Sequence, residues 1–377
     1  MVNAVGGYDN WSETYDRDLN DIFEVQDEIS GIIANKLREN LNNNPKEESL
    51  VHPTTTNYTA YIHYLKGLHF WNKLTPADTF KAIDYFEKAI SIEPDYAQAY
   101  AKTAMAYGYL GAKGQILPKQ AFDIVHQYAD KAMHIDPTVA ESYSAKAGAY
   151  IFYDWKWKEA YEMLQMALKL NPATMSTYEM LGFYHIVMGQ KDEAVKILEK
   201  AIQIDPLSPL IIQSLGNAYI IAERYGEAIR EAEKLLEMNP EMRSALEMKA
   251  WGIGMGGDWL SSSKWFEDVH RLTNHPLKGL MGLGFAYAKL GEREKALDCI
   301  RRMEQRSKEE PNSVIDADMA AVWFALGDND KCFEHLFICL EKHMGPVSYY
   351  LEYPPYKGIK NDPRYREIRK KEFGEEE

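Results

Sequence analysis

A short phrase ending in proline recurs along this sequence and constrains its fold more than any other feature. The proline follows Ile/Leu/Met and an acidic or amide residue at Pro94, Pro137, Pro172, Pro206 and Pro240, and Pro276 and Pro311 continue the series more loosely. Successive prolines are 43, 35, 34, 34, 36 and 35 residues apart. Because proline cannot continue a helix and pushes its predecessor out of the α region, each phrase predicts a helix stop followed by a restart.

Small residues recur at fixed distances from these prolines. Alanine stands twelve residues before the proline at Ala82, Ala160, Ala194 and Ala228, and five before it at Ala89, Ala132, Ala167 and Ala201. A preceding segment carries a small residue followed three positions later by an aromatic, as in Gly216 and Tyr219. Small residues let helices approach and aromatics fill the remaining volume, so the pattern predicts repeated pairs of packed helices.

With this period and these small residues, residues 58–345 resemble eight tetratricopeptide repeats. The resemblance implies an all-α, right-handed superhelical solenoid of about eight helix pairs. Residues 346–377 are predicted to form a C-terminal capping segment, with a short helix that begins at Pro363. Counting back from Pro276 places Lys264 and Arg271 at the usual alanine positions, so the sixth repeat is expected to be the most irregular.

The amino-terminal segment, residues 1–45, carries a different pattern. An apolar stripe predicts a helix from about residue 18, and residues 46–57 read as a polar linker. The stripe consists of Ile22, Val25, Ile29, Ile33, Leu37 and Leu41. Residues 11–41 resemble the end of a TolB-amino-terminal-like domain, which in bacterial signalling proteins joins an effector to tetratricopeptide repeats. The sequence contains only a remnant of that domain and no effector, so the resemblance transfers no effector activity.

Charge and hydropathy exclude several classes of partner. The chain has 43 basic and 57 acidic residues, a net charge of −14, which opposes binding to nucleic acid. No stretch holds the roughly 18 uninterrupted apolar residues of a membrane span, so direct membrane insertion is not expected. The chain shows no signal peptide. The cytoplasm is the favoured compartment, and the periplasm is the alternative if an upstream membrane segment is missing.

Two motifs suggest chemistry and have simpler explanations. Cys332, His335 and Cys339 share one helical face and could ligate zinc, but both cysteines stand at positions where other repeats have alanine, which favours a structural core. The glycines from Gly252 to Gly257 resemble a phosphate-binding loop but close the first helix of repeat six. We therefore expect no cofactor, no metal and no catalytic residue.

The resemblance implies a concave wall made by the first helix of each repeat. The candidate groove residues on this wall are Tyr61, Tyr64, Leu68, Met105, Tyr109, Phe152, Glu179, Phe183, Ile186, Gln213, Asn217, Ile220, Trp251, Met255 and Phe285. They are mainly apolar and aromatic, and they lack the Lys/Arg-and-Asn set with which co-chaperone repeats bind a peptide carboxylate. The alternative interpretation is that these residues simply pack between adjacent repeats.

These features predict a non-catalytic protein-interaction scaffold in a bacterial signalling or regulatory system. Its partner would be a protein or peptide, with an apolar or amphipathic segment of some basic character bound in the groove. Two alternatives remain open at this level. The chain could be a self-assembly module that forms a homodimer through its amino-terminal segment, or a metal-binding enzyme embedded in a repeat array.

Overall fold

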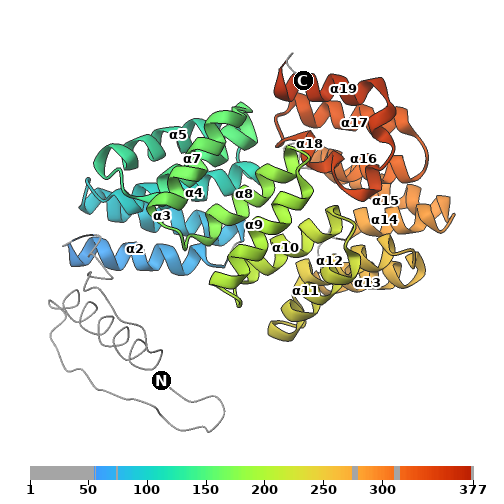
Figure 1. Cartoon of the computed structure of the whole chain (residues 1–377), viewed down its shortest axis with the longest axis horizontal. Helices are drawn as coiled ribbons and strands as arrows, with labels where there is room; N and C mark the ends of the chain where they lie inside the picture. The colour runs from blue at the N-terminus through green and yellow to red at the C-terminus, as the bar shows by residue number, and fades with distance from the viewer. Residues whose placement is uncertain (1–54, 56, 74, 274–278, 310–314, 375–377) are drawn as a thin grey trace, which may run out of the picture.

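The computed structural model describes residue 55 and residues 57–73, 75–273, 279–309 and 315–374 (Figure 1). These residues form eight consecutive helix pairs and contain no strand. The pairs are α2 (Tyr58–Trp71) and α3 (Pro76–Ile92), α4 (Ala97–Ala112) and α5 (Pro118–Ile135), α6 (Ala140–Ala149) and α7 (Trp157–Leu170), α8 (Met175–Val187) and α9 (Lys191–Ile204), α10 (Pro209–Ile221) and α11 (Tyr225–Met238), α12 (Arg243–Met255) and α13 (Trp259–Thr273), α14 (Leu280–Lys289) and α15 (Arg293–Glu309), and α16 (Ile315–Ala325) and α17 (Asn329–Glu341). The predicted all-α solenoid is confirmed. The predicted amino-terminal helix lies outside the described residues.

The proline phrases are turns between one repeat and the next. Each first helix begins three residues after the proline, at positions 97, 140, 175, 209 and 243. In four phrases the Asp or Asn before the proline accepts a hydrogen bond from the backbone N–H two residues on. Examples are Asp136 with Thr138 at 2.8 Å and Asn171 with Ala173 at 3.0 Å. This side-chain turn explains why a short acidic or amide residue precedes the proline.

The second helices set the register of the array. Five of them begin 34 residues apart, at Trp157, Lys191, Tyr225, Trp259 and Arg293. The small buried residues follow the same period. They are Ala160, Ala194, Ala228, Ser262 and Ala296.

The predicted alanine positions of the sixth repeat are therefore wrong. Lys264 and Arg271 are exposed, whereas Ser262 and Val269 are buried at the equivalent positions. The Ser262 hydroxyl donates to the Ala250 carbonyl at 2.8 Å. Pro276 stands two residues later relative to the helix than the other prolines do, so counting back from it shifts the register by two.

Close packing within and between repeats uses the predicted small and aromatic residues. A methyl group on Gly182 would lie 2.8 Å from Leu198 Cδ1, so only glycine fits there without displacing a neighbour. Several of the recurring tyrosines join successive repeats by donating a hydrogen bond to a glutamate on the preceding second helix. Tyr219 donates to Glu199 and Tyr287 donates to Glu267, both at 2.9 Å.

The chain after the eighth pair folds back onto the array. It comprises α18 (Val347–Leu351), the short 3₁₀ turns η3 (Pro354–Tyr356) and η4 (Ile359–Asn361), and α19 (Pro363–Phe373), and we call it the C-terminal segment. The helix predicted to begin at Pro363 is present, and the Asp362 carboxylate caps it by accepting from the Arg364 backbone N–H at 3.0 Å. Figure 1 shows α18 near the end of α8, far from it in sequence.

Candidate functional site

The first helices form the inner face of the array. From α4 onward, each first helix contacts the first helix of the next repeat, whereas successive second helices make few close contacts with one another. A stack that is tighter on one side curves toward that side. We therefore call the surface of α2, α4, α6, α8, α10, α12, α14 and α16 the inner face, and that of the second helices the outer face.

The predicted groove residues divide by burial. Tyr64, Ile186, Ile220 and Phe285 are buried in the repeat core. The other eleven are half-buried on first helices or at their ends. They are Tyr61, Leu68, Met105, Tyr109, Phe152, Glu179, Phe183, Gln213, Asn217, Trp251 and Met255. The inner face thus offers partly accessible side chains in several repeats.

Two of these aromatic residues already contact the chain's own C-terminal segment. The Phe183 ring stacks on Tyr349 of α18, with ring centroids 4.2 Å apart. Phe152 lies against Gly345, because a side chain built on that glycine would meet its ring at 3.5 Å. The C-terminal segment therefore covers Phe152 and Phe183 on the inner face of repeats three and four.

The end of α19 anchors this fold-back. The Trp157 ring stacks on Phe373 with centroids 4.8 Å apart, and its indole N–H donates to the Glu372 carbonyl at 2.7 Å. The buried Glu372 carboxylate accepts from the backbone N–H groups of Val347 and Ser348, which caps α18. Burial raises the pKa of Glu372 to about 7 even though these hydrogen bonds lower it.

Trp251 serves mainly in packing between repeats. Its ring makes edge contacts with Phe266 and Phe285, with centroids 5.2 and 5.3 Å away. The half-buried amides Gln213 and Asn217 form no side-chain hydrogen bond with other described residues. Because its ring packs against Phe266 and Phe285, Trp251 offers a partner less exposed surface than its position in the first helix predicts.

Two carboxylates on first helices lack a partner. Among the described residues, Glu179 on α8 and Asp318 on α16 form neither a hydrogen bond nor an ion pair. Burial raises the pKa of Glu179 to about 7, against the opposing charge of Lys113. Burial and the Glu247 charge raise the pKa of Asp318 to about 7, against the charge of Arg243. Each carboxylate is half-buried and has no cation in direct contact among the described residues, so an added positive charge would stabilise its ionised form.

Asp318 is a candidate site residue that the sequence patterns did not predict. It occupies a position in repeat eight where repeats six and seven have Met248 and Gly282. The change from an apolar or small residue to a carboxylate at one register position was the available signal. It becomes visible only after the helix boundaries of the last repeat are known.

The Cys332, His335 and Cys339 set belongs to the core. Both thiols are buried between α16 and α17, and burial raises the pKa of Cys332 to about 12. The His335 ring pairs through Nδ1 with the Asp316 carboxylate at 2.9 Å. A search of the described part of the chain finds no group of three or more His, Cys, Asp or Glu side chains that could hold a metal ion.

The family comparison identifies the repeat. The family model described as "Tetratricopeptide repeat" matches residues 176–206 and 211–242, which include α8 to α11. Within the described residues, no helix is long and apolar enough to cross a membrane.

Among curated proteins, residues of this chain are 29% identical over 107 residues to "Putative adenylate cyclase 3" of Rhizobium meliloti strain 1021. The match covers 28% of this chain and 18% of that protein. The chain thus spans less than a fifth of the length of this relative.

Solved structures share the fold at low identity. The human IFIT1 dimer with m7Gppp-AAAA has a TM-score of 0.53 and 15% identity, over 81% of this chain and 75% of that chain. The Cut9–Hcn1 hetero-tetramer has a TM-score of 0.53 and 14% identity, over 84% of this chain and 55% of that chain. At such identity these likenesses concern the fold alone.

Proposed function

We propose that this tetratricopeptide repeat array is a non-catalytic interaction scaffold that binds an amphipathic, basic segment of a partner protein on its inner face. The fold supports a protein-interaction role, because stacked helix pairs present an extended surface without requiring a closed active site. The nature of the partner segment is inferred from the side chains on that surface.

The unpartnered carboxylates Glu179 and Asp318 carry this proposal. A half-buried carboxylate that no cation contacts directly is costly to ionise, and burial raises the pKa of each to about 7, so each is partly neutral near pH 7. A Lys or Arg side chain from a partner would restore the ionised form. The two residues lie on α8 and α16, so they would contact different basic residues or different parts of one segment.

Apolar side chains elsewhere on the inner face would hold the remainder of the segment. Phe152 and Phe183 are covered by the C-terminal segment, which leaves the half-buried residues elsewhere on the inner face. Met105 on α4 and Met255 on α12 provide adaptable apolar contacts, and Gln213 and Asn217 on α10 provide amide hydrogen bonds.

We further propose that the scaffold works within a bacterial signalling or regulatory system, on the cytoplasmic side of the membrane. The partial similarity to the Rhizobium meliloti protein and the resemblance of residues 11–41 to a TolB-amino-terminal-like domain support this context. The cyclase name belongs to a much longer protein, so the present chain is proposed to recruit partners and not to form a cyclic nucleotide.

Affinity capture from a native bacterial lysate at two pH values tests this function. A partner captured by the wild-type chain should bind about a hundredfold more weakly to the Glu179→Gln/Asp318→Asn variant, since each of the two lost charge contacts costs about 1.4 kcal/mol. Wild-type binding should tighten from pH 6 to pH 8 as both carboxylates lose their protons.

Two exposed outer-face carboxylates provide the matched control. Asp84→Asn/Glu193→Gln also removes two negative charges, and within the described part of the chain each of these groups pairs with a lysine on its own helix. The control should bind the partner like wild type. Equal weakening in both variants would attribute binding to net charge and contradict the inner-face proposal.

A further inference from the structure

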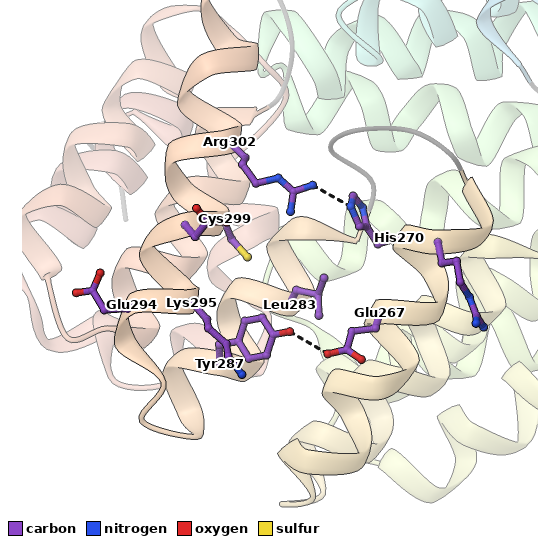
Figure 2. A pocket seen from close by; sticks show the side chains of 10 residues that line it. Glu267, His270, Leu283, Tyr287, Glu294, Lys295, Cys299 and Arg302 are labelled. Carbon is purple, nitrogen blue, oxygen red and sulfur yellow. Dashed lines mark hydrogen bonds between the residues drawn. The ribbon is translucent and has the colours of Figure 1, made fainter.

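A pocket of about 500 Å³ opens between the sixth and seventh repeats (Figure 2). Its walls come from the second helices α13 and α15, and α14 contributes Leu283 and Tyr287. It therefore lies on the outer side of the array and is separate from the inner face discussed above. Its volume is in the range of pockets that bind small molecules or single large side chains.

The pocket combines an apolar base with a charged rim. Leu283, the buried Cys299 and the ring of Tyr287 form the apolar part. As Figure 2 shows, Tyr287 donates its hydroxyl hydrogen to Glu267 at 2.9 Å, and the Arg302 guanidinium donates to His270 Nε2 at 2.9 Å. These hydrogen bonds link α13 to both α14 and α15 and so fix the distance between the pocket walls.

The preceding repeat interface shows why the pocket exists. Helices α13 and α15 begin 34 residues after α11 and α13, so each lining residue has a counterpart one repeat earlier. The counterpart of Cys299 is Trp265. Its half-buried indole lies under the Lys249 ammonium, 4.9 Å from the ring centroid. The same position holds Met163, Ile197 and Glu231 in earlier repeats, all larger than cysteine.

The seventh repeat thus keeps the helix register but has a smaller side chain at this position than the other repeats do. Cysteine in place of tryptophan leaves the volume of an indole unfilled at this register position, between helices that the Tyr287 and Arg302 hydrogen bonds link. Tight packing is the rule in such arrays, and a space lined by Leu, Cys and Tyr favours an apolar occupant.

We propose that this pocket binds an aromatic side chain of a partner protein, of indole or phenol size, in the place that Trp265 fills one repeat earlier. The rim supplies cations suited to an aromatic ring. Lys295 on α15 already lies 5.1 Å from the Tyr287 ring centroid, within the range of a cation–π contact. An aliphatic side chain would fill less of the space and would gain no cation–π contact.

Protection of Cys299 from alkylation tests the proposal on the wild-type chain. N-acetyl-tryptophanamide is the probe, N-acetyl-leucinamide is the comparison, and mass spectrometry reads alkylation at each cysteine. At about ten times its dissociation constant the aromatic probe should slow alkylation of Cys299 about tenfold, by simple competition. The leucine compound should protect much less. Cys332 and Cys339, buried between α16 and α17, should not respond to either.

A filled-pocket variant provides the second arm. Cys299→Trp restores the side chain of the preceding repeat and should abolish binding of the probe, measured by calorimetry, while leaving the helical content unchanged. Arg301→Trp is the matched control, because it adds the same side chain to the exposed side of α15, where Arg301 pairs only with Asp298. It should bind the probe like wild type.

Three results would overturn the proposal. They are an alkylation rate of Cys299 that the aromatic probe leaves unchanged, equal protection by the leucine compound, and probe binding that persists in a folded Cys299→Trp variant. If Cys299→Trp does not fold, the alkylation experiment on the wild-type chain still decides the question. None of these results depends on the inner-face function, which the carboxylate variants test separately.

Discussion

The fifth and sixth repeats meet in the same register as the sixth and seventh, but the two interfaces differ at the position of Cys299. In the first this position holds the half-buried Trp265, and in the second it holds the smaller Cys299, which lines the pocket. The helix starts, fixed 34 residues apart, are the same in both. The comparison teaches that turns and small residues set the backbone of such an array, whereas the volume of a few side chains decides where it can bind something.

The largest expected effect comes from emptying the filled interface. Trp265→Ala should lower the free energy of unfolding by about 3 kcal/mol, because it removes an indole without letting the helices collapse. It should also create a second site for N-acetyl-tryptophanamide. Urea denaturation and calorimetry measure the two effects. Leu260→Ala changes an exposed side chain of the same helix and should neither lower the free energy of unfolding nor create a probe site. A similar loss of stability in both variants would contradict the difference between the two interfaces.

A smaller effect is expected from the hydrogen bond that spans the open interface. Tyr287→Phe removes the bond to Glu267 and should cost about 1 kcal/mol of stability. Tyr219→Phe removes the equivalent bond to Glu199 at an interface where the larger Glu231 stands at the position of Cys299, and should cost a similar amount. Urea denaturation of both variants gives the comparison. If Tyr287→Phe cost nothing while Tyr219→Phe did, the open interface would not be held by this bond.

The chemistry of Cys299 gives a pH-dependent measure of how closed the pocket is. Burial raises the pKa of its thiol to about 11. Since the thiolate is the reactive form, the alkylation rate at Cys299 should keep rising through pH 10. The rate for a free cysteine, with a pKa of about 8.5, should level off about two pH units earlier. Levelling near pH 9 at Cys299 would indicate a more exposed base than the structure shows.

The smallest effect is expected at the rim. Lys295 is exposed and pairs with Glu292 just before the start of its helix, so Lys295→Gln should change stability by less than about 0.5 kcal/mol. The same change should weaken binding of the aromatic probe a few-fold, through loss of the cation near the ring. Thermal unfolding and calorimetry separate the two effects. Unchanged probe affinity would mean that only the apolar base of the pocket contributes to binding.

Local patterns in the sequence predicted most of the array. The prolines, the Asp or Asn before them and the 34-residue spacing of alanines act within one or two turns of chain, so they indicate helix ends and helix contacts directly. The same logic failed in repeat six, where a two-residue shift before Pro276 moved the predicted contact positions from Ser262 and Val269 to Lys264 and Arg271.

Contacts between distant parts of the chain could not be predicted in this way. No local pattern connects Trp157 with Phe373, or Phe183 with Tyr349, although these pairs determine which part of the inner face the C-terminal segment covers. The pocket at Cys299 is likewise invisible in the sequence until the register is known, because its cause is a side chain that is smaller than its counterpart. The groove residues therefore remain predictions.

Site-specific photocross-linking to the captured partner tests the central claim most directly. A photoreactive amino acid placed at Asn217 on the inner face is compared with one at Lys200, an exposed position on the second helix α9. We predict that the partner cross-links from position 217 and not from position 200, and that Glu179→Gln/Asp318→Asn reduces the yield. Cross-linking from position 200 alone, with no product at 217, would contradict binding on the inner face.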